Sequence, residues 1–368
     1  MKHVRLIDVS EIIMGQSPDS SSYNEEKRGI PFFQGNADFG ELHPNVRIWC
    51  DRPTKIAKEN DILISVRAPI GALNYAKEKC CIGRGLASIR AKEHYLKGYL
   101  FYLLKSKNNE LNKQGTGSTF KSINKSVLEN INIPVISKEE QERIVNQLEK
   151  VENTIKLRKQ QLSLLDDLVK SRFVELFIGK DYPAKTVDEV SLRKGEYGAQ
   201  SASVEYDPSR PRYVRITDIN DDGTLNDDIV ASANSADDEQ YKLEYGDFMF
   251  ARMGATVGKT YAFIEGNQIF AGYLIRFRLN RDLINPRYLY WYTRLDEYWN
   301  WVKLNQSGAA QPGINSKKYG SLQIPLPPIS EQNAFASFVE RIDKSKFVLD
   351  NNVKFIRKFS LYNFYNNN

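Results

Sequence analysis

A long segment occurs twice in this chain, in the same register. Residues 115–165 align without a gap with residues 306–356, which lie 191 positions further on. The aligned pairs include Gly117-Ser118-Thr119-Phe120-Lys121-Ser122-Ile123-Asn124 with Gly308-Ala309-Ala310-Gln311-Pro312-Gly313-Ile314-Asn315, Ile131-Asn132-Ile133-Pro134 with Leu322-Gln323-Ile324-Pro325, and Glu140-Gln141 with Glu331-Gln332. With small gaps the match extends back towards the N-terminus, where Asp61 to Gly71 aligns with Asp247 to Gly258. Solenoid repeats are roughly 20–50 residues long, so this period predicts two similar domains with a core each.

Composition is that of an ordinary globular chain. The 368 residues, 41% hydrophobic and 27% charged, suffice for two domains and their connectors. No apolar run approaches the roughly 20 residues that span a bilayer, and Asp8 and Glu11 interrupt any signal-peptide core. The three cysteines, Cys50, Cys80 and Cys81, form neither a metal pair nor a disulfide framework. The sequence therefore predicts a cytoplasmic protein with reduced thiols and no membrane contact.

The charge distribution constrains a nucleic-acid partner without requiring one. A net charge of +6 permits a polyanion partner. Residues 218–247, however, contain ten acidic residues and one lysine, a stretch that phosphate would repel. If the second half binds nucleic acid, this stretch should face away from it; a solvated loop without a role is the alternative.

Two heptad patterns predict two long helices that pack through one seam each. Each follows proline and an acidic first turn, which favour a helix start. The first, residues 138–178, would be roughly 60 Å long at 1.5 Å per residue. The seam residues are Ile144, Leu148, Val151, Ile155, Leu162, Leu165 and Val169, interrupted by Arg158, and Phe335, Val339, Ile342, Leu349, Val353 and Ile356, interrupted by Lys346.

The simplest partner for the first seam is the second helix, running antiparallel. With one domain at each end, such a pair relates the two repeats by an approximate twofold axis. Helices that pack only on their own domains, or that join two chains, are the alternatives.

Within each repeat the pattern is mixed. Residues 61–66, 245–250 and 273–279 are expected to be strands. Residues 95–105 and 286–302 are expected to be helices. Five aromatic residues of the second helix could stack on bases, but their helical spacing favours core packing: Tyr290, Trp291, Tyr292, Trp299 and Trp301.

Two motifs resemble nucleotide or cofactor sites but do not fit them. Residues 253–260 nearly form a P-loop, yet the first glycine stands at 254 where the spacing requires 253. A glycine turn with one basic side chain, Lys259, is the simpler interpretation. Asn285-Pro286-Arg287-Tyr288 resembles the Asn-Pro-Pro-Tyr tetrapeptide of amino-methyltransferases, but Asn and Pro also suit a helix start. The three histidines show no ligand or triad spacing, so the sequence predicts no catalytic residue, metal site or cofactor.

The whole arrangement strongly resembles the specificity subunit of type I restriction-modification enzymes. Each repeat closes on Gly-x-x-x-x-x-Ile-Asn, then Ile-Pro, then Glu-Gln and a heptad helix, in one fixed order. The resemblance implies an α+β fold of two similar mixed α/β target recognition domains joined by two long antiparallel coiled-coil helices. Its domains are residues 1–137 and 181–328, and its spacer helices are residues 138–180 and 329–361.

The same resemblance implies a function and partners. Each recognition domain reads one half of a bipartite target in double-stranded DNA, with half-sites about one helical turn apart, roughly 34–36 Å. The helices set the gap and dock two methyltransferase subunits. Methylation, S-adenosylmethionine and any ATP-driven nuclease subunit belong to partner chains. Because the repeats have diverged, the target should be asymmetric.

Comparison of the two copies assigns candidate DNA contacts. Residues alike in both copies should hold the scaffold or contact phosphate, and residues that differ should read bases. The backbone candidates are Gly117, Ser118, Asn124, Gly308, Asn315, Ser307, Arg67 and Arg252, with Lys259 as a further basic contact. The base-reading candidates are Gln34, Asn36, Lys121, Arg215, Thr217 and Gln311. A turn or capping role is the alternative for each.

A second class of function stays open. The chain could be a non-catalytic scaffold that binds proteins and assembles a complex through its heptad helices. Phosphate contacts make the logarithm of the affinity fall linearly with the logarithm of the salt concentration, whereas such a scaffold predicts binding that is insensitive to salt.

Overall fold

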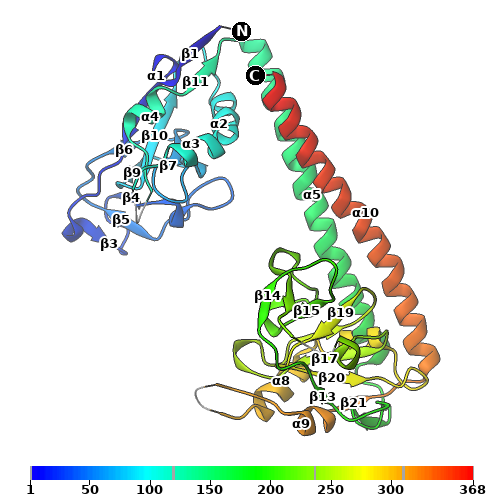
Figure 1. Ribbon diagram of the computed structural model, residues 1–368. Coiled ribbons are helices and arrows are strands. Elements are labelled where there is room, and N and C mark those ends of the chain that lie inside the picture. Colours follow the sequence, from blue (N-terminus) through cyan, green and yellow to red (C-terminus); the bar gives the residue numbers. More distant parts are fainter. Residues whose placement is uncertain (1, 118–120, 236–237, 309–310, 368) are drawn as a thin grey trace. The chain divides into compact units, whose positions relative to one another are not determined.

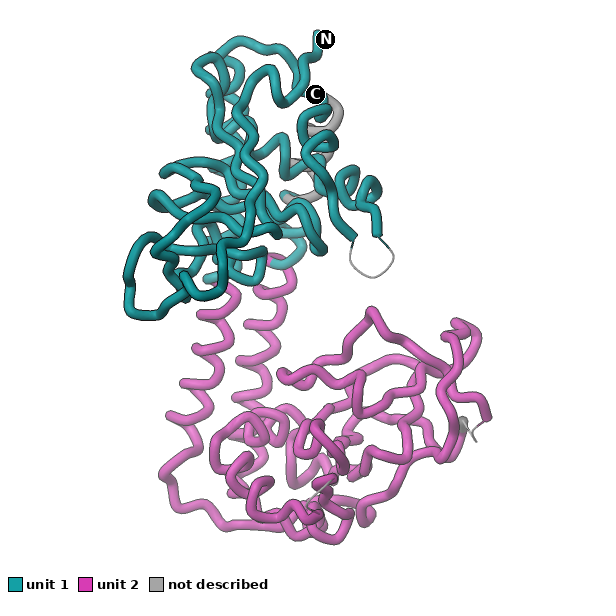
Figure 2. The backbone as a smooth tube through the Cα atoms, turned by 90° about the vertical axis from the view of Figure 1, so that its left-hand side faces the viewer, with its two compact units in different colours: residues 1–160, 350–368 teal, residues 161–349 magenta. Residues whose placement is uncertain are grey.

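The computed structural model describes residues 2–117, 121–235, 238–308 and 311–367, with side chains described as far as Ile356. The chain forms two compact units (Figure 2). Unit 1 contains Met1–Gln160 and Asp350–Asn368, and unit 2 contains Gln161–Leu349. Each unit is described separately below.

A four-stranded antiparallel sheet forms the centre of unit 1 (Figure 1). Its order is β2 (Ser10–Met14), β10 (Leu86–Ala91), β7 (Ile62–Ser65) and β8 (Leu73–Tyr75). Ile89 lies opposite both Ile12 and Ile62, so β-branched side chains of three strands share one face. With α2 (Lys97–Ser106) they form the main core of the unit.

The second sheet of unit 1 is five-stranded and mixed. Its order is β3 (Tyr23–Asn24), β5 (Ile48–Cys50), β4 (Ile30–Phe33), β9 (Cys80–Ile82) and β6 (Ile56–Ala57), with β4 and β9 parallel. Cys50, Cys80 and Cys81 are buried free thiols, as the sequence predicts. Burial raises the pKa of Cys80 to about 12, so this thiol stays protonated at neutral pH.

Unit 2 repeats this topology. Its four-stranded sheet has the order β13 (Glu196–Tyr197), β20 (Leu274–Arg278), β17 (Asp247–Ala251) and β18 (Thr260–Ala262). The parallel pair β15 (Arg212–Val214) and β19 (Gln268–Phe270) corresponds to β4 and β9. A further pair joins β14 (Ser203–Glu205) and β16 (Ala231–Ala233). The duplication in the sequence is therefore a duplication of strand order.

The same buried ion pair starts the same strand in both units. The Asp61 carboxylate accepts two hydrogen bonds of 2.8 Å from Arg90. The Asp247 carboxylate accepts bonds of 2.9 and 3.3 Å from Arg278. Both aspartates are at most 2% exposed, so each charge is compensated where water cannot reach it.

One of the helices predicted from the sequence is divided in the structure. Residues 286–302 form two helices, α7 (Pro286–Tyr292) and α8 (Asp296–Asn305). The break follows from tertiary contacts: the Thr293 hydroxyl lies 2.9 Å from the Thr260 hydroxyl in the core, and Leu295 turns to an extended conformation with its side chain buried. The two units also contain the short helices α1 (Leu6–Val9), α3 (Asn108–Gln114), α4 (Lys125–Glu129), α6 (Asp238–Tyr241) and α9 (Ser316–Gly320).

Each long helix follows a short terminal strand pair. In unit 1, β1 (His3–Arg5) pairs with β11 (Asn132–Pro134), and in unit 2, β12 (Ala184–Thr186) pairs with β21 (Gln323–Pro325). The helices that follow are α5 (Lys138–Phe177) and α10 (Ile329–Asn367). Within the described chain, no helix is long and apolar enough to cross a membrane.

The predicted seam positions form the less exposed stripe of each long helix. Ile144, Leu148, Val151, Ile155, Leu162 and Leu165 are partly buried on α5, and Phe335, Val339 and Val353 are buried on α10, with Ile342, Leu349 and Ile356 partly buried. In unit 2 the helices run antiparallel, because Phe173 packs on Phe335 at 5.3 Å between ring centroids and Asp166 pairs with Lys346. The cation that interrupts the second seam is thus neutralised from the facing helix.

Candidate nucleic-acid interface

A hairpin loop lies at the same place in both units, over the end of a central strand. In unit 1 the Thr116 and Ser122 backbones exchange hydrogen bonds of 3.0 and 2.9 Å, and in unit 2 Ser307 and Gly313 do the same at 3.0 and 2.9 Å. Gly117 and Gly308 have φ angles of 120° and 105°, a region that strongly favours glycine. These glycines therefore shape the loops. Ser118 lies outside the described residues.

The hairpin loops correct the alignment of two candidate arginines. The Ile123 N–H donates to Val66 O and the Ile314 N–H donates to Arg252 O, both at 2.9 Å. Arg252 is thus the counterpart of Val66, and Arg67 is that of Met253, one residue further on. Because successive residues in extended backbone face opposite sides, Arg67 and Arg252 are not equivalent contacts.

The two arginines have different surroundings. Arg67 is exposed, and its guanidinium has no hydrogen bond or ion pair within the part of the chain that the structure describes. The Arg252 guanidinium lies 4.8 Å from the ring centroid of Tyr197 and 6.0 Å from that of Tyr273. Both rings are exposed, at 40% and 55%. Cation–π contacts of this kind hold a guanidinium in place while leaving its donors available.

A tight turn beside each strand end was missed by the sequence reasoning. It consists of Gly83-Arg84-Gly85 in unit 1 and Ala271-Gly272-Tyr273 in unit 2. The Val66 N–H donates to Gly85 O at 2.9 Å, and the Arg252 N–H donates to Tyr273 O at 3.0 Å. The alignment of residues 81–86 with residues 269–274 could have indicated this turn, because the two segments have the same length but different side chains at the turn.

A third segment follows the parallel strand pair in both units. The Gln34 N–H donates to the Asp38 carboxylate at 2.8 Å, and the Arg215 N–H donates to the Asp218 carboxylate at 2.9 Å. The Gln34 side chain is exposed and Asn36 is half-buried, so both can reach a partner. Gln34 O also accepts from the Gly85 N–H at 3.1 Å, which places Gln34 beside the turn that carries Arg84.

Arg215 and Thr217 are more constrained. The Arg215 guanidinium donates to the Asp218 carboxylate at 2.8 Å and to Ile229 O at 2.6 Å. The Thr217 hydroxyl lies 3.3 Å from the same carboxylate. Both residues nevertheless line a cavity of about 410 Å³, together with Gln200 and Tyr273. They shape this cavity rather than reach freely out of it.

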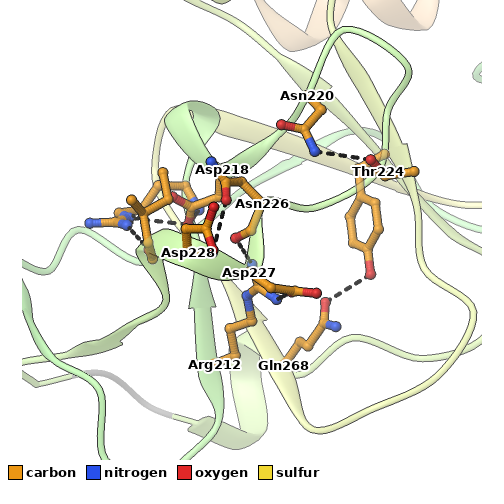
Figure 3. A network of polar contacts seen from close by, with 11 residues as sticks. Arg212, Asp218, Asn220, Thr224, Asn226, Asp227, Asp228 and Gln268 are labelled. Atoms are coloured by element: carbon orange, nitrogen blue, oxygen red, sulfur yellow. Dashed lines mark hydrogen bonds and ion pairs between the residues drawn. The ribbon is translucent and has the colours of Figure 1, made fainter. Parts of the chain in front are cut away.

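The acidic stretch of unit 2 neutralises nearby cations (Figure 3). Arg212 donates to Asp227 at 2.7 Å and to Asn226 O at 2.6 Å. Lys259 pairs with Asp221 at 2.7 Å and donates to Ile219 O at 3.2 Å, and this lysine lowers the pKa of Asp221. Lys259 is thereby a paired residue and only 21% exposed. Strand β18, not a helix, follows it, so this glycine turn is not a P-loop.

Two further candidates act as helix caps. The Asn124 side chain accepts from the Val127 N–H at 3.1 Å, and Asn315 accepts from the Lys318 N–H at 2.9 Å. Asn285 likewise caps α7 by accepting from the Arg287 N–H at 2.9 Å, which confirms the cap interpretation. Lys121 and Gln311 are exposed on the hairpin loops, and Ser307 holds the loop base. The aromatic residues of α7 and α8 pack against the main core of unit 2, as their spacing predicts.

Each unit therefore presents three segments around one strand end: a hairpin loop, a glycine turn and the turn after the parallel strand. Exposed arginine, glutamine and tyrosine side chains on these segments can donate to base edges and phosphates or stack on bases. Among the described residues, no group of three or more His, Cys, Asp or Glu side chains is placed to hold a metal ion.

A family model described as the type I restriction modification DNA specificity domain matches residues 1–166 and 186–354. These two matches cover both copies of the repeat. This chain belongs to that family.

Several known specificity subunits are similar to this chain. A Methanocaldococcus jannaschii protein assigned to the MjaX type I restriction enzyme is 42% identical over 171 residues, covering 46% of this chain and 40% of that protein. The MjaVIII specificity subunit of the same organism is 25% identical over 318 residues, covering 78% of this chain and 73% of that protein. The crystal structure of the type I restriction-modification S subunit from M. genitalium covers 98% of this chain and 93% of its own, at 15% identity and a TM-score of 0.54. That likeness shows the fold.

Proposed function

We propose that this chain is the DNA-reading subunit of a type I restriction-modification system, with unit 1 and unit 2 each reading one half of an asymmetric bipartite target. One observation carries this proposal. Both units build the same backbone framework around a strand end, with matching hydrogen bonds, but place different side chains on it. A common scaffold with different readers suits two different half-sites.

The long helices would set the gap and dock partner chains. Their predicted seam positions are buried or partly buried, whereas large apolar residues elsewhere on both helices are exposed. On α5 they include Leu157, Leu164 and Leu168, at 52%, 64% and 47%, and on α10 they include Phe347 and Val348, at 68% and 58%. Clustered exposed apolar side chains typically mark a protein interface. We assign them to docking of two methyltransferase subunits, with or without a nuclease subunit.

The catalytic work would then belong to those partners. The chain itself would act without a cofactor of its own, on double-stranded DNA in the cytoplasm. A Leu164→Asp, Leu168→Asp variant should lose co-purification with the methyltransferase, because a desolvated carboxylate is costly in an apolar interface. Glu142→Lys, an exposed α5 position, serves as the control and should co-purify normally.

The decisive experiment maps methylated bases in a genome with and without this gene. The chain is expressed with the methyltransferase encoded beside it, and methylated positions are determined by long-read sequencing. The proposal expects a motif with two different halves and a constant gap that disappears when this gene alone is deleted. A pattern unchanged by the deletion would refute it.

A scaffold that binds only proteins is the second candidate, and the same exposed apolar residues favour it. The salt dependence of DNA binding distinguishes the two candidate functions. For a complex that contacts several phosphates, the logarithm of the binding constant falls linearly with the logarithm of the salt concentration, with a slope of about −0.9 per phosphate. Binding of the full complex to duplex DNA, measured from 50 to 200 mM salt, should show this slope; a complex without measurable DNA binding at 50 mM salt would support the scaffold.

A further inference from the structure

The glycine turn beside each strand end has the same backbone in both units and a different side chain at its centre. The Leu86 N–H donates to Gly83 O at 3.0 Å, and the Leu274 N–H donates to Ala271 O at 2.8 Å. The strand next to the turn is held in the same way, since the Gln16 N–H donates to Ile82 O at 3.0 Å and the Ala199 N–H donates to Phe270 O at 2.9 Å. On this common frame, Arg84 in unit 1 stands where Gly272 stands in unit 2.

Arg84 is held by its backbone and free at its side chain. A Cβ atom on Gly83 would lie 3.0 Å from Gln34 Cα, and one on Gly85 would lie 2.4 Å from Gln34 O. The two glycines therefore let the turn approach Gln34 closely. The Arg84 N–H donates to Ser17 Oγ at 3.3 Å. Its side chain is exposed, and within the described ranges its guanidinium has no hydrogen bond or ion pair.

In unit 2 a cavity borders the position that corresponds to this arginine of unit 1. The cavity of about 410 Å³ is lined by Gly272 and Tyr273 of the turn, and by Gln200, Arg215 and Thr217. A Cβ atom on Gly272 would lie 2.5 Å from the Gln200 amide nitrogen, 2.9 Å from Gln200 Cδ and 3.2 Å from Ala199 O, so a larger residue here requires the Gln200 side chain to move. Gly272 is not among the glycines with a positive φ, so its backbone accepts other residues.

We propose that Arg84 reads a guanine in the half-site of unit 1 and that the half-site of unit 2 lacks this contact. A guanidinium donates two hydrogen bonds to O6 and N7 of guanine in the major groove. A phosphate contact would be expected at positions alike in both units, whereas this position differs. Gln34 lies beside Arg84 and suits a neighbouring adenine. The inference rests on the proposed function.

The test compares methylation motifs of wild type, Arg84→Ala and Arg84→Gln, each expressed with the methyltransferase. Arg84→Ala should relax one guanine of one half-site, with discrimination there falling on the order of ten- to hundredfold. Arg84→Gln should shift that position towards adenine. The other half-site and the gap should stay unchanged. Gly272→Arg should alter only the half-site that Arg84→Ala leaves intact.

Arg28→Ala is the matched control. Arg28 precedes β4, at the opposite end of that strand from Gln34, and pairs only with exposed Glu26 among the described residues. It should leave the motif unchanged. Methylation that falls evenly at all sites in both Arg84 variants would assign a phosphate contact and overturn the inference, and so would an unchanged motif. A wild-type chain that directs no motif would instead refute the proposed function.

Discussion

Two buried glutamines fasten the long helices to their units. The Gln332 carbonyl accepts from the Asn285 N–H at 2.9 Å, and its amide donates to Leu283 O at 3.1 Å and Pro327 O at 2.8 Å. In unit 1, Gln141 accepts from the Leu96 N–H at 2.9 Å and donates to His94 O at 3.1 Å. In each copy of the Glu-Gln pair, the glutamine thus satisfies backbone groups just ahead of a helix, α2 in unit 1 and α7 in unit 2.

Removing one of these glutamines should be costly. Gln332→Ala leaves buried donors and acceptors without partners, so we expect a loss of about 2 kcal/mol in the free energy of unfolding. Gln332→Glu, with the same shape, loses both donated bonds and should also destabilise. Gln147→Ala, an exposed position on α5, is the control. Thermal unfolding followed by circular dichroism measures all three, and equal melting of Gln332→Ala and wild type would contradict this role.

A carboxylate that follows β12 in unit 2 predicts that the stability of the fold depends on pH. The Glu189 carboxylate accepts from the Thr186 N–H at 2.8 Å. This bond, with Lys185 and the Thr186 hydroxyl, lowers the pKa of Glu189 to about 2 from 4.5. Since the folded state favours the charged form, its contribution is present above pH 4.5 and is lost as the pH falls towards 2. Glu189→Gln should therefore have a lower melting temperature than the wild type at pH 7. The difference in melting temperature should shrink between pH 4.5 and 2; a difference that stays constant over this range would exclude this charge as the cause.

At the scale of elements, the α5–α10 pair of unit 2 depends on an aromatic cluster. Phe335 lies 5.3 Å from Phe173 and 5.6 Å from Phe177, between ring centroids, and is 1% exposed. Phe335→Ala should cost about 3–5 kcal/mol because it leaves a cavity. Phe347→Ala, on the same helix and 68% exposed, should change stability by less than about 0.5 kcal/mol. Urea unfolding of the two variants tests the difference, and similar losses would argue against the seam.

The elements also show how far the sequence could lead. The heptads indicated both long helices and their less exposed face, because helix periodicity is local and burial follows it. They did not indicate where α10 ends: the sequence predicts residue 361 and the helix continues to Asn367. The break between α7 and α8 at Thr293 was not predictable, since it depends on Thr260, which lies in the distant strand β18. The interface was found in part: Gln34 and Arg67 are exposed as a contact requires. In unit 1 the turn that carries Arg84 lies beside Gln34, and in unit 2 Tyr197 and Tyr273 lie beside Arg252. Both arrangements depend on backbone pairing between distant segments. Asn124 and Asn315 were ambiguous because a cap and a phosphate contact favour the same residue type.

At the scale of the whole molecule, the proposed spacer role makes a prediction about the gap. Helix α5 passes from unit 1 to unit 2 at residues 160–161, and α10 passes back at residues 349–350. A seven-residue insertion at both junctions keeps the heptad register and lengthens each helix by about 10.5 Å at 1.5 Å per residue. At 3.4 Å per base pair, the unread gap should grow by about three base pairs while both half-sites stay the same.

Four-residue insertions also lengthen the helices but rotate the seam out of phase, so they should reduce methylation instead. Methylation mapping distinguishes these outcomes, and a gap unchanged by the seven-residue insertion would show that the helices dock partners without measuring the DNA.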